Sequence, residues 1–201
     1  MAFPDRIAIA TRNAHKLREI ERICADWPVG WVTVANHPME SFPDVEETGD
    51  TYLENALLKA RATAASLSLP ALADDSGIEV DALGGRPGPR SARYAGEDAT
   101  DERNLQALLG ALRGIPPGGK TARYRCLAVL AFPGGEELHA EAVCEGAVIA
   151  EGRGSGGFGY DPAFVPAGWD ETMAELTPEQ KDRISHRGRA FRALRELLGV
   201  Q

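Results

Sequence analysis

The sequence predicts an α/β protein with a mixed β-sheet and flanking helices. A short β-prone run at 6–10 is followed by 14–25, where apolar residues recur at helical spacing. Farther along, two long β-prone runs at 122–132 and 138–149 are separated by Pro133-Gly134-Gly135, a pattern typical of an antiparallel hairpin. Because some strands are adjacent in sequence and others are separated by helices, we expect parallel and antiparallel pairs in one sheet.

Turn and capping signals delimit the other elements. The helix at 52–67 has Asp50 or Thr51 as its N-cap, and Thr177 forms a capping box with Gln180. The expected elements are, in order, a strand at 31–34, a loop over 37–49, a helix over 52–67, a buried strand at 71–73, an acidic turn at 74–77, an extended stretch at 78–80, turns over 84–89, a helix from Thr100 that ends before Gly114, a glycine-rich loop over 152–159, and a terminal helical region from Thr177 to about Leu198 that Gly188 weakens or kinks.

Size and composition favour a single domain spanning residues 1–201. With 201 residues, of which 43% are hydrophobic, the chain can bury a core without disulfides, so we expect its three cysteines to be core residues. The net charge of −8 disfavours nucleic acid as a partner. No apolar run approaches the roughly 18 residues of a membrane span, and the first residues lack the pattern of a signal peptide. We therefore expect a cytoplasmic protein with no membrane partner.

The acidic segment Asp74-Asp75-Ser76-Gly77 is the first candidate site. Two adjacent carboxylates at the end of an apolar strand repel each other, and a magnesium ion, which prefers oxygen ligands, would relieve that repulsion. A solvated turn is the alternative, because Asp, Ser and Gly favour turns for local reasons. The pair Glu46-Glu47 either completes the metal ligands or complements the dipole of the helix that follows.

Three further segments suit a nucleotide. Residues 11–16 lie between a strand and a helix, where N–H groups attract phosphate, and the alternative is an ordinary Asn cap. Residues 156–162 carry two aromatics and a carboxylate among glycines, which suits a planar base or a plain loop equally. Lys181 and Ser185 lie four residues apart and can point the same way on a helix, although a solvated basic face has the same pattern.

In this order, the motifs resemble the inosine triphosphate pyrophosphatase family, which hydrolyses noncanonical purine nucleoside triphosphates. The resemblance covers nearly the whole sequence. It implies an elongated two-lobed α/β fold around a central mixed sheet with flanking helices, and a homodimer. It also implies that Mg²⁺-dependent hydrolysis between the α- and β-phosphates converts ITP, dITP and XTP to the monophosphate and pyrophosphate. The motifs that carry it are Ala10 to Asn13 with Lys16, Glu46 to Gly49, Glu54 to Ala56 with Lys59 to Arg61, Ala73 to Gly77, Ser91 to Tyr94, Gly157 to Pro162, and Ile184 to Gly188.

The resemblance also implies individual roles. Asp75 is the expected general base and a metal ligand, together with Glu46, which we prefer to Glu47. Substrate is expected to contact Thr11, Arg12, Asn13, Ala14, His15, Lys16 and Ser76 towards the phosphates, and Phe158, Gly159, Tyr160, Asp161, Lys181, His186 and Arg187 towards the purine. Arg187 or a backbone N–H would donate to the carbonyl at the six position of the purine. Asn55 and Lys59 are secondary candidates on the phosphate side.

Where this chain has Arg12 and His15, many relatives carry glycine, so close approach of the loop backbone to phosphate is less favoured here. Arg12 either compensates for this with its charge or points to solvent.

Two other functions stay open. One is a nucleotide-binding regulator without hydrolytic activity, against which the acidic residues Glu46, Asp74 and Asp75 argue. The other is a pyrophosphatase for modified pyrimidines, which the motifs at 158–161 and 185–187 disfavour.

Overall fold

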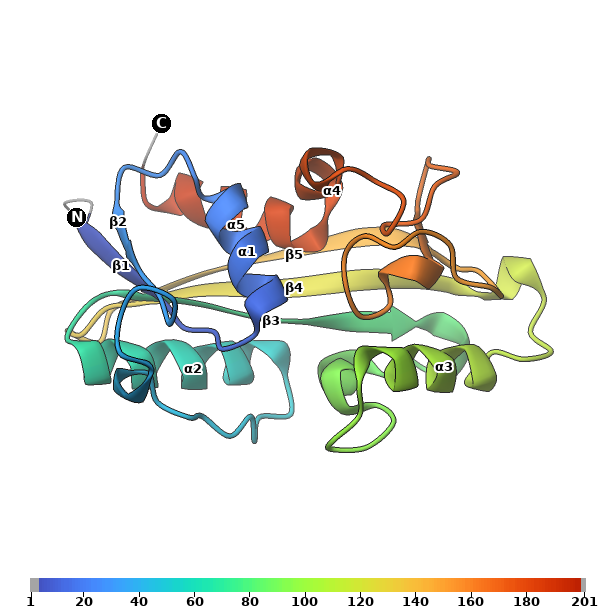
Figure 1. The fold of residues 1–201 in the computed structure, drawn as a ribbon, viewed down its shortest axis with the longest axis horizontal. Helices are drawn as coiled ribbons and strands as arrows, with labels where there is room; N and C mark the ends of the chain where they lie inside the picture. The colour runs from blue at the N-terminus through green and yellow to red at the C-terminus, as the bar shows by residue number, and fades with distance from the viewer. Residues whose placement is uncertain (1–3, 200–201) are drawn as a thin grey trace. The chain divides into compact units, whose positions relative to one another are not determined.

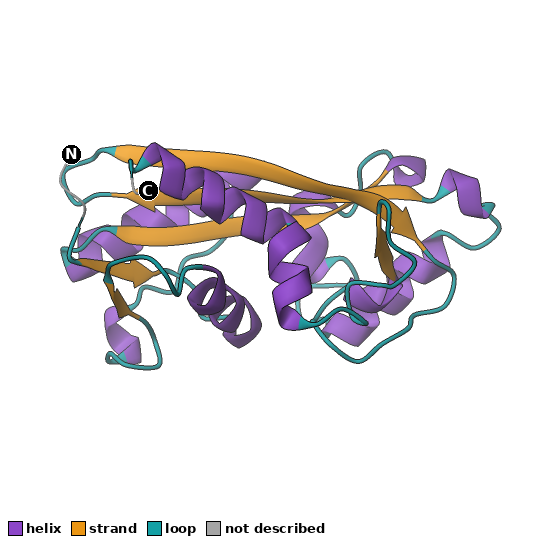
Figure 2. Ribbon diagram, turned by 90° about the horizontal axis from the view of Figure 1, so that it is seen from above, coloured by secondary structure: helices purple, strands orange, loops and turns teal. Residues whose placement is uncertain are grey.

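The computed structural model describes residues 4–199, and these residues form a mixed β-sheet with helices packed against it (Figures 1 and 2). The sheet order is β2-β1-β3-β4-β5-β6. β1 pairs in parallel with β2 and β3, whereas β5 and β6 are antiparallel, so the predicted mixed α/β sheet is confirmed. The strands are β1 (Arg6–Ile9), β2 (Gly30–Val32), β3 (Ala71–Val80), β4 (Thr121–Ala131), β5 (Glu137–Val148) and β6 (Phe164–Pro166); the helices are α1 (Ala14–Ile23), α2 (Tyr52–Leu67), α3 (Asp101–Ala111), α4 (Pro178–Ile184) and α5 (His186–Leu197).

The chain divides into two compact units. Unit 1 comprises residues 1–75, 126–142 and 187–201, and unit 2 comprises residues 76–125 and 143–186. The long strands β3, β4 and β5 each contribute residues to both units.

Unit 1 has a core on each face of its strands, and the alternation of side chains along β1 explains why. Ile7 and Ile9 pack with α1 and α5, whereas Ala8 lies on the opposite face with the alanines of α2. Figure 1 shows the same arrangement, with α2 on one face and α1 and α5 on the other. Small residues on the α2 face allow that helix to lie close to the strands, which positions its polar side chains next to β3.

Unit 2 has a single apolar cluster. Leu105 and Leu108 of α3 pack with Ile78 of β3, Tyr124 of β4 and Phe164 of β6. Thr100 caps α3 by accepting a hydrogen bond from the backbone N–H of Arg103, as expected for a helix that begins at Asp101.

Most predicted elements are confirmed, and three need correction. β2 begins at Gly30 and ends at Val32, one to two residues before its predicted bounds. The terminal helical region breaks at Ser185, whose ψ of 155° is extended, and Gly188 lies inside α5 without ending it. The third correction concerns the acidic segment: β3 continues from Ala71 to Val80 without a turn at Asp74.

The three cysteines are free and buried, which confirms that they are core residues. Within residues 4–199, no helix has the length and apolar character that a membrane span requires.

Candidate active site

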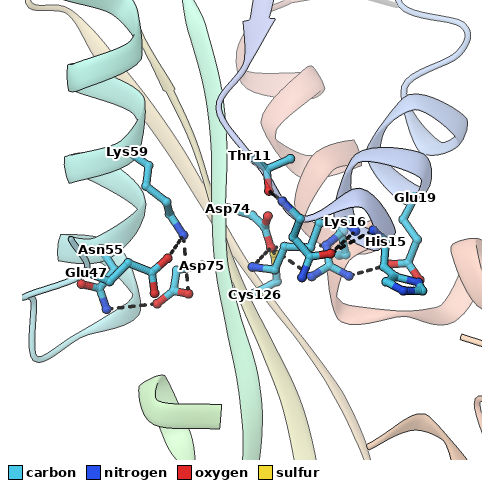
Figure 3. Close-up of polar contacts among 12 residues, drawn as sticks. Thr11, His15, Lys16, Glu19, Glu47, Asn55, Lys59, Asp74, Asp75 and Cys126 are labelled. Carbon is cyan, nitrogen blue, oxygen red and sulfur yellow. Dashed lines mark hydrogen bonds and ion pairs between the residues drawn. The ribbon is translucent and has the colours of Figure 1, made fainter. Parts of the chain in front are cut away.

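The acidic segment is part of a continuous strand, and this determines the site. In a β-strand, successive side chains point to opposite faces, so Asp74 and Asp75 separate (Figure 3). Both are buried, at 2% and 4% exposure. The predicted turn, and with it the alternative of a solvated turn, is wrong, because a cationic side chain lies beside each carboxylate inside the protein and no chain reversal is needed to reach water.

Asp75 faces α2 in unit 1. The Asn55 Nδ2 donates to Asp75 Oδ2 at 3.3 Å, and the Lys59 Nζ lies 3.8 Å from Asp75 Oδ1. Lys59 also contacts Glu47, with 2.6 Å between Nζ and Oε1. The four-residue spacing of Asn55 and Lys59 therefore brings both to Asp75, as their common helix face predicts.

A short loop holds Glu47 in this position. The Gly49 N–H donates to Asn55 Oδ1 at 2.8 Å, and Thr51 forms a capping box with Glu54 at the start of α2. A Cβ on Gly49 would lie 2.6 Å from the Cβ of Glu54, so only glycine fits here. Glu46 is exposed, whereas Glu47 is partly buried beside Lys59.

The charges around Asp75 do not balance completely. Burial raises the pKa of Asp75, with further contributions from Glu47 and Asp74, and these outweigh the opposing effects of Lys16 and Lys59. Burial alone would lower the pKa of Lys59, but the neighbouring carboxylates raise it. Asp75 is therefore a carboxyl group from which a proton is less readily lost than from an exposed aspartate.

Asp74 faces α1 and α5, and its surroundings are different. Its Oδ2 lies 3.2 Å from Lys16 Nζ and 3.1 Å from Arg187 Nη2. The same guanidinium contacts Glu19 Oε2 through Nη1 at 2.5 Å. Burial alone would raise the pKa of Asp74, but Lys16 and Arg187, with Lys59, hold it well below the usual range. Asp74 is a fixed anion in a buried network of ion pairs.

This network changes the interpretation of Arg187. Its side chain is fully enclosed, at 1% exposure, and its guanidinium is directed at two carboxylates. These surroundings are those of a structural ion pair and do not match the predicted contact with a purine. Glu19 was not predicted at all, although its position three residues after Lys16 places both on one face of α1.

The segment before α1 caps the helix, and Lys16 in the first turn of α1 is directed at Asp74. Asn13 Oδ1 accepts from the backbone N–H groups of His15 and Lys16, so the predicted alternative of an Asn cap is confirmed. Arg12 donates to the Phe42 carbonyl at 2.7 Å and pairs with Asp44, which directs it to the neighbouring loop. The other predicted residues lie close by: Thr11 Oγ1 accepts from the Asn13 N–H, Ala14 is the first residue of α1, and His15 Nδ1 contacts Arg18.

Unit 2 contains the residues predicted to recognise the base, apart from Arg187. Asp161, at 3% exposure, is the centre of this group. It accepts from Lys181 Nζ at 2.5 Å and from the Phe158 N–H at 2.9 Å. The Lys181 Nζ also lies 5.1 Å from the centre of the Phe158 ring, a cation–π distance. Gly157 has a φ of +68°, and a Cβ there would lie 2.1 Å from Asp161 Oδ2.

The other predicted residues of unit 2 are held by contacts with neighbouring segments or are partly buried. Tyr160 is buried in the apolar cluster and donates to the Ser91 carbonyl at 2.7 Å, which matches a loop anchor better than a base contact. The Gly159 N–H donates to Asp101 Oδ2 at 3.0 Å. His186, at 4% exposure, stacks on Tyr124, a residue that the sequence identified only as part of a strand. Ser76 follows Asp75 in β3 and is partly buried.

The sequence and the fold of this chain were compared with those of known proteins. The Ham1 family model matches residues 7–197. A dITP/XTP pyrophosphatase of Geobacillus kaustophilus is 50% identical over 190 residues, covering 94% of this chain and 92% of the relative. One of Geobacter sulfurreducens is 47% identical over 196 residues, 98% of each chain. The solved structure of a HAM1 protein from Coxiella burnetii has a TM-score of 0.85 at 40% identity, covering 96% of this chain and 98% of that one. The chain therefore belongs to the Ham1 family.

Proposed function

We propose that this chain hydrolyses noncanonical purine nucleoside triphosphates, dITP, XTP and ITP, to the monophosphate and pyrophosphate, and so prevents their incorporation into nucleic acid. The relatives named dITP/XTP pyrophosphatases match it over nearly their whole length. The single observation that carries the proposal is the group of buried Asp75 with partly buried Glu47 and Lys59, which combines a carboxyl group of raised pKa with a second carboxylate and a cation.

The residues present fit a magnesium ion. Within residues 4–199 no group of three or more His, Cys, Asp or Glu side chains is placed to hold a metal. Magnesium is usually held by one or two carboxylates with the remaining positions taken by water and substrate phosphates. Glu47 contributes to raising the pKa of Asp75, as a neighbouring carboxylate does where the counter-charge is incomplete. We therefore assign the ion to Asp75 and Glu47 in place of Glu46, which is exposed.

The protein's own groups have separate roles. Asp75 is the proposed general base, because its raised pKa brings it closer to the range in which a base accepts a proton efficiently. Lys59 and Lys16 supply positive charge for the phosphates and for the charge that spreads over them during cleavage between the α- and β-phosphates. When bound, magnesium would neutralise the leaving pyrophosphate and lower the pKa of a coordinated water.

The purine is assigned to Phe158, Lys181 and His186 of unit 2. Phe158 offers a partly buried ring, and Asp161 fixes both its backbone and Lys181. Since the guanidinium of Arg187 is directed at Asp74 and Glu19, we assign the donor for the purine six-position carbonyl to a backbone N–H of this segment. An amino group at that position would face a donor, which disfavours adenine.

A nucleotide panel with Mg²⁺, scored for pyrophosphate and orthophosphate separately, tests the proposal. We expect pyrophosphate from dITP, XTP and ITP and little turnover of dATP, with a loss of at least about a hundredfold in kcat for Asp75→Asn. Orthophosphate as the product would refute the proposed cleavage between the α- and β-phosphates. An unchanged rate for Asp75→Asn would favour the alternative function, a nucleotide-binding regulator without hydrolytic activity.

The metal ligand has its own matched pair of variants. Glu46→Gln and Glu47→Gln remove one charge each from neighbouring positions, and only Glu47 lies beside Lys59. We expect Glu47→Gln to raise the Mg²⁺ concentration needed for half-maximal rate, and a larger effect of Glu46→Gln would restore the original prediction.

We also propose, from the family resemblance, that two copies assemble as a homodimer, which light scattering of the purified protein tests.

A further inference from the structure

Tyr124 of β4 contacts two separate parts of the group assigned to the purine. Its hydroxyl donates to Asp161 Oδ1 at 3.2 Å. Its ring stacks on the His186 imidazole, with ring centres 4.6 Å apart and planes 8° from parallel. Phe164 packs against the same ring at 4.7 Å and 61°. Tyr124 is 7% exposed, so its ring is held by neighbours on several sides.

The contacts of Tyr124 with Asp161 and His186 connect strand β4 to a loop and to the start of α5. Asp161 accepts hydrogen bonds from the Phe158 N–H and from Lys181, so a shift of its carboxylate moves both. The loop that carries Phe158 contains Gly157 and Gly159 at positive φ and lies outside the helices and strands. His186 begins α5 directly after the break at Ser185. Tyr124 is therefore the common support of a glycine-rich loop and a helix start.

We propose that Tyr124 is a positioning residue for purine recognition: its hydroxyl fixes Asp161 and thereby Phe158 and Lys181, and its ring fixes His186. This inference rests on the proposed function, because it takes these residues as the base contacts. Tyr124 does not touch the phosphates or the attacking water in this scheme. Its loss should weaken nucleotide binding and purine selectivity while the chemical step keeps its rate.

The hydroxyl and the ring can be tested separately. Tyr124→Phe removes the donor to Asp161 and keeps the stack on His186, whereas Tyr124→Leu removes both. The matched control is Tyr94→Phe, which removes a hydroxyl from a tyrosine that packs against the same apolar cluster. Each protein is assayed for pyrophosphate release from dITP and dGTP, and for inhibition by inorganic pyrophosphate, which reports on the phosphate side alone.

For Tyr124→Phe we expect KM for dITP to rise about tenfold, the factor that corresponds to about 1.4 kcal/mol, and the preference for dITP over dGTP to fall. We expect kcat and the inhibition constant for pyrophosphate to stay within about twofold, the split that a positioning role at the base predicts. Tyr124→Leu should raise KM further, and Tyr94→Phe should match the unmodified enzyme.

Unchanged KM and selectivity in Tyr124→Phe would overturn the inference, and so would a fall in kcat at constant KM. If Tyr124→Leu does not fold, Tyr124→Phe decides alone. Calorimetric titration of dITP into the Asp75→Asn protein, with and without Tyr124→Phe, separates this inference from the proposed function. If the unmodified enzyme releases no pyrophosphate but Tyr124→Phe still weakens dITP binding about tenfold, the proposed hydrolysis fails and the base contact stands.

Discussion

Glu19→Gln removes one charge from a buried network without changing the shape of the side chain. Glu19 and Asp74 are the anions of this network and Lys16 and Arg187 are its cations, so the formal charges cancel. The variant leaves a net positive charge at side chains exposed by 8% or less, apart from Lys16 at 16%. Removing one partner of a buried ion pair costs about 3–5 kcal/mol. Because glutamine still offers an oxygen to Arg187, we expect about 3 kcal/mol.

The chain contains a matched control, an ion pair whose arginine lies on α5 with Arg187. Arg195 of α5 pairs with Asp26, whose side chain is 69% exposed. Asp26→Asn is the same kind of change as Glu19→Gln, but an exposed ion pair contributes at most about 1 kcal/mol. The two variants therefore compare one chemical substitution at two levels of burial.

Urea and thermal unfolding followed by circular dichroism measure the difference. At this chain length, 3 kcal/mol corresponds to a Tm lower by about 6–12 °C, whereas Asp26→Asn should change Tm by no more than about 4 °C. Equal Tm values for the two variants would refute the claim that Glu19 balances charge in a buried network.

Three further predictions follow from local electrostatics and backbone geometry. The folded-state pKa of Asp74 is depressed, so its contribution to stability is complete above the unfolded pKa of about 3.9 and is lost as pH falls below it; Asp74→Asn should therefore flatten urea-measured stability below about pH 4, and an unchanged slope there would contradict this. Burial raises the pKa of Asp75, so protons should compete with Mg²⁺ for this carboxylate at higher pH than at an ordinary aspartate. The Mg²⁺ affinity measured by calorimetry should therefore fall as pH is lowered. Asp75→Asn should remove this dependence of Mg²⁺ affinity on pH. At Gly157, alanine would combine a positive φ with a clash against Asp161, whereas at Gly168 it would have a positive φ and open space around its Cβ. Chemical unfolding should therefore show a loss of unfolding free energy about 1–3 kcal/mol larger for Gly157→Ala than for Gly168→Ala. Equal losses for the two variants would exclude the clash.

Local signals predicted the helices well because the residues that set their ends are adjacent in sequence. The predicted bounds of α2, Tyr52 and Leu67, are those observed, and its start depends on Thr51 and Glu54, three residues apart. The capping box of Thr177 and Gln180 at the start of α4 was found in the same way. Periodicity and capping are short-range, so one sequence suffices to identify them.

The acidic segment was predicted as a turn, which is wrong, because the partners that stabilise it in a strand are remote in sequence. Within its own segment, Asp-Asp-Ser-Gly has the composition of a turn. The charges that allow it to remain in a buried strand come from Lys16, Lys59 and Arg187, up to 113 residues away. Tyr124 was missed for a similar reason, because its two contacts, Asp161 and His186, are distant in sequence.

The correction at β3 gives the two aspartates distinct surroundings, which a turn would not have separated. A turn would have placed both carboxylates near one ion, with comparable solvation and comparable pKa. The strand instead places Asp74 among balanced cations, where it stays ionised and fixes Lys16 and Arg187. It places Asp75 beside a second carboxylate, where its raised pKa suits exchange of a proton or binding of a cation. Strand alternation thus separates, over a single peptide bond, a carboxylate that is fixed in ion pairs from the carboxyl group that we propose as the general base.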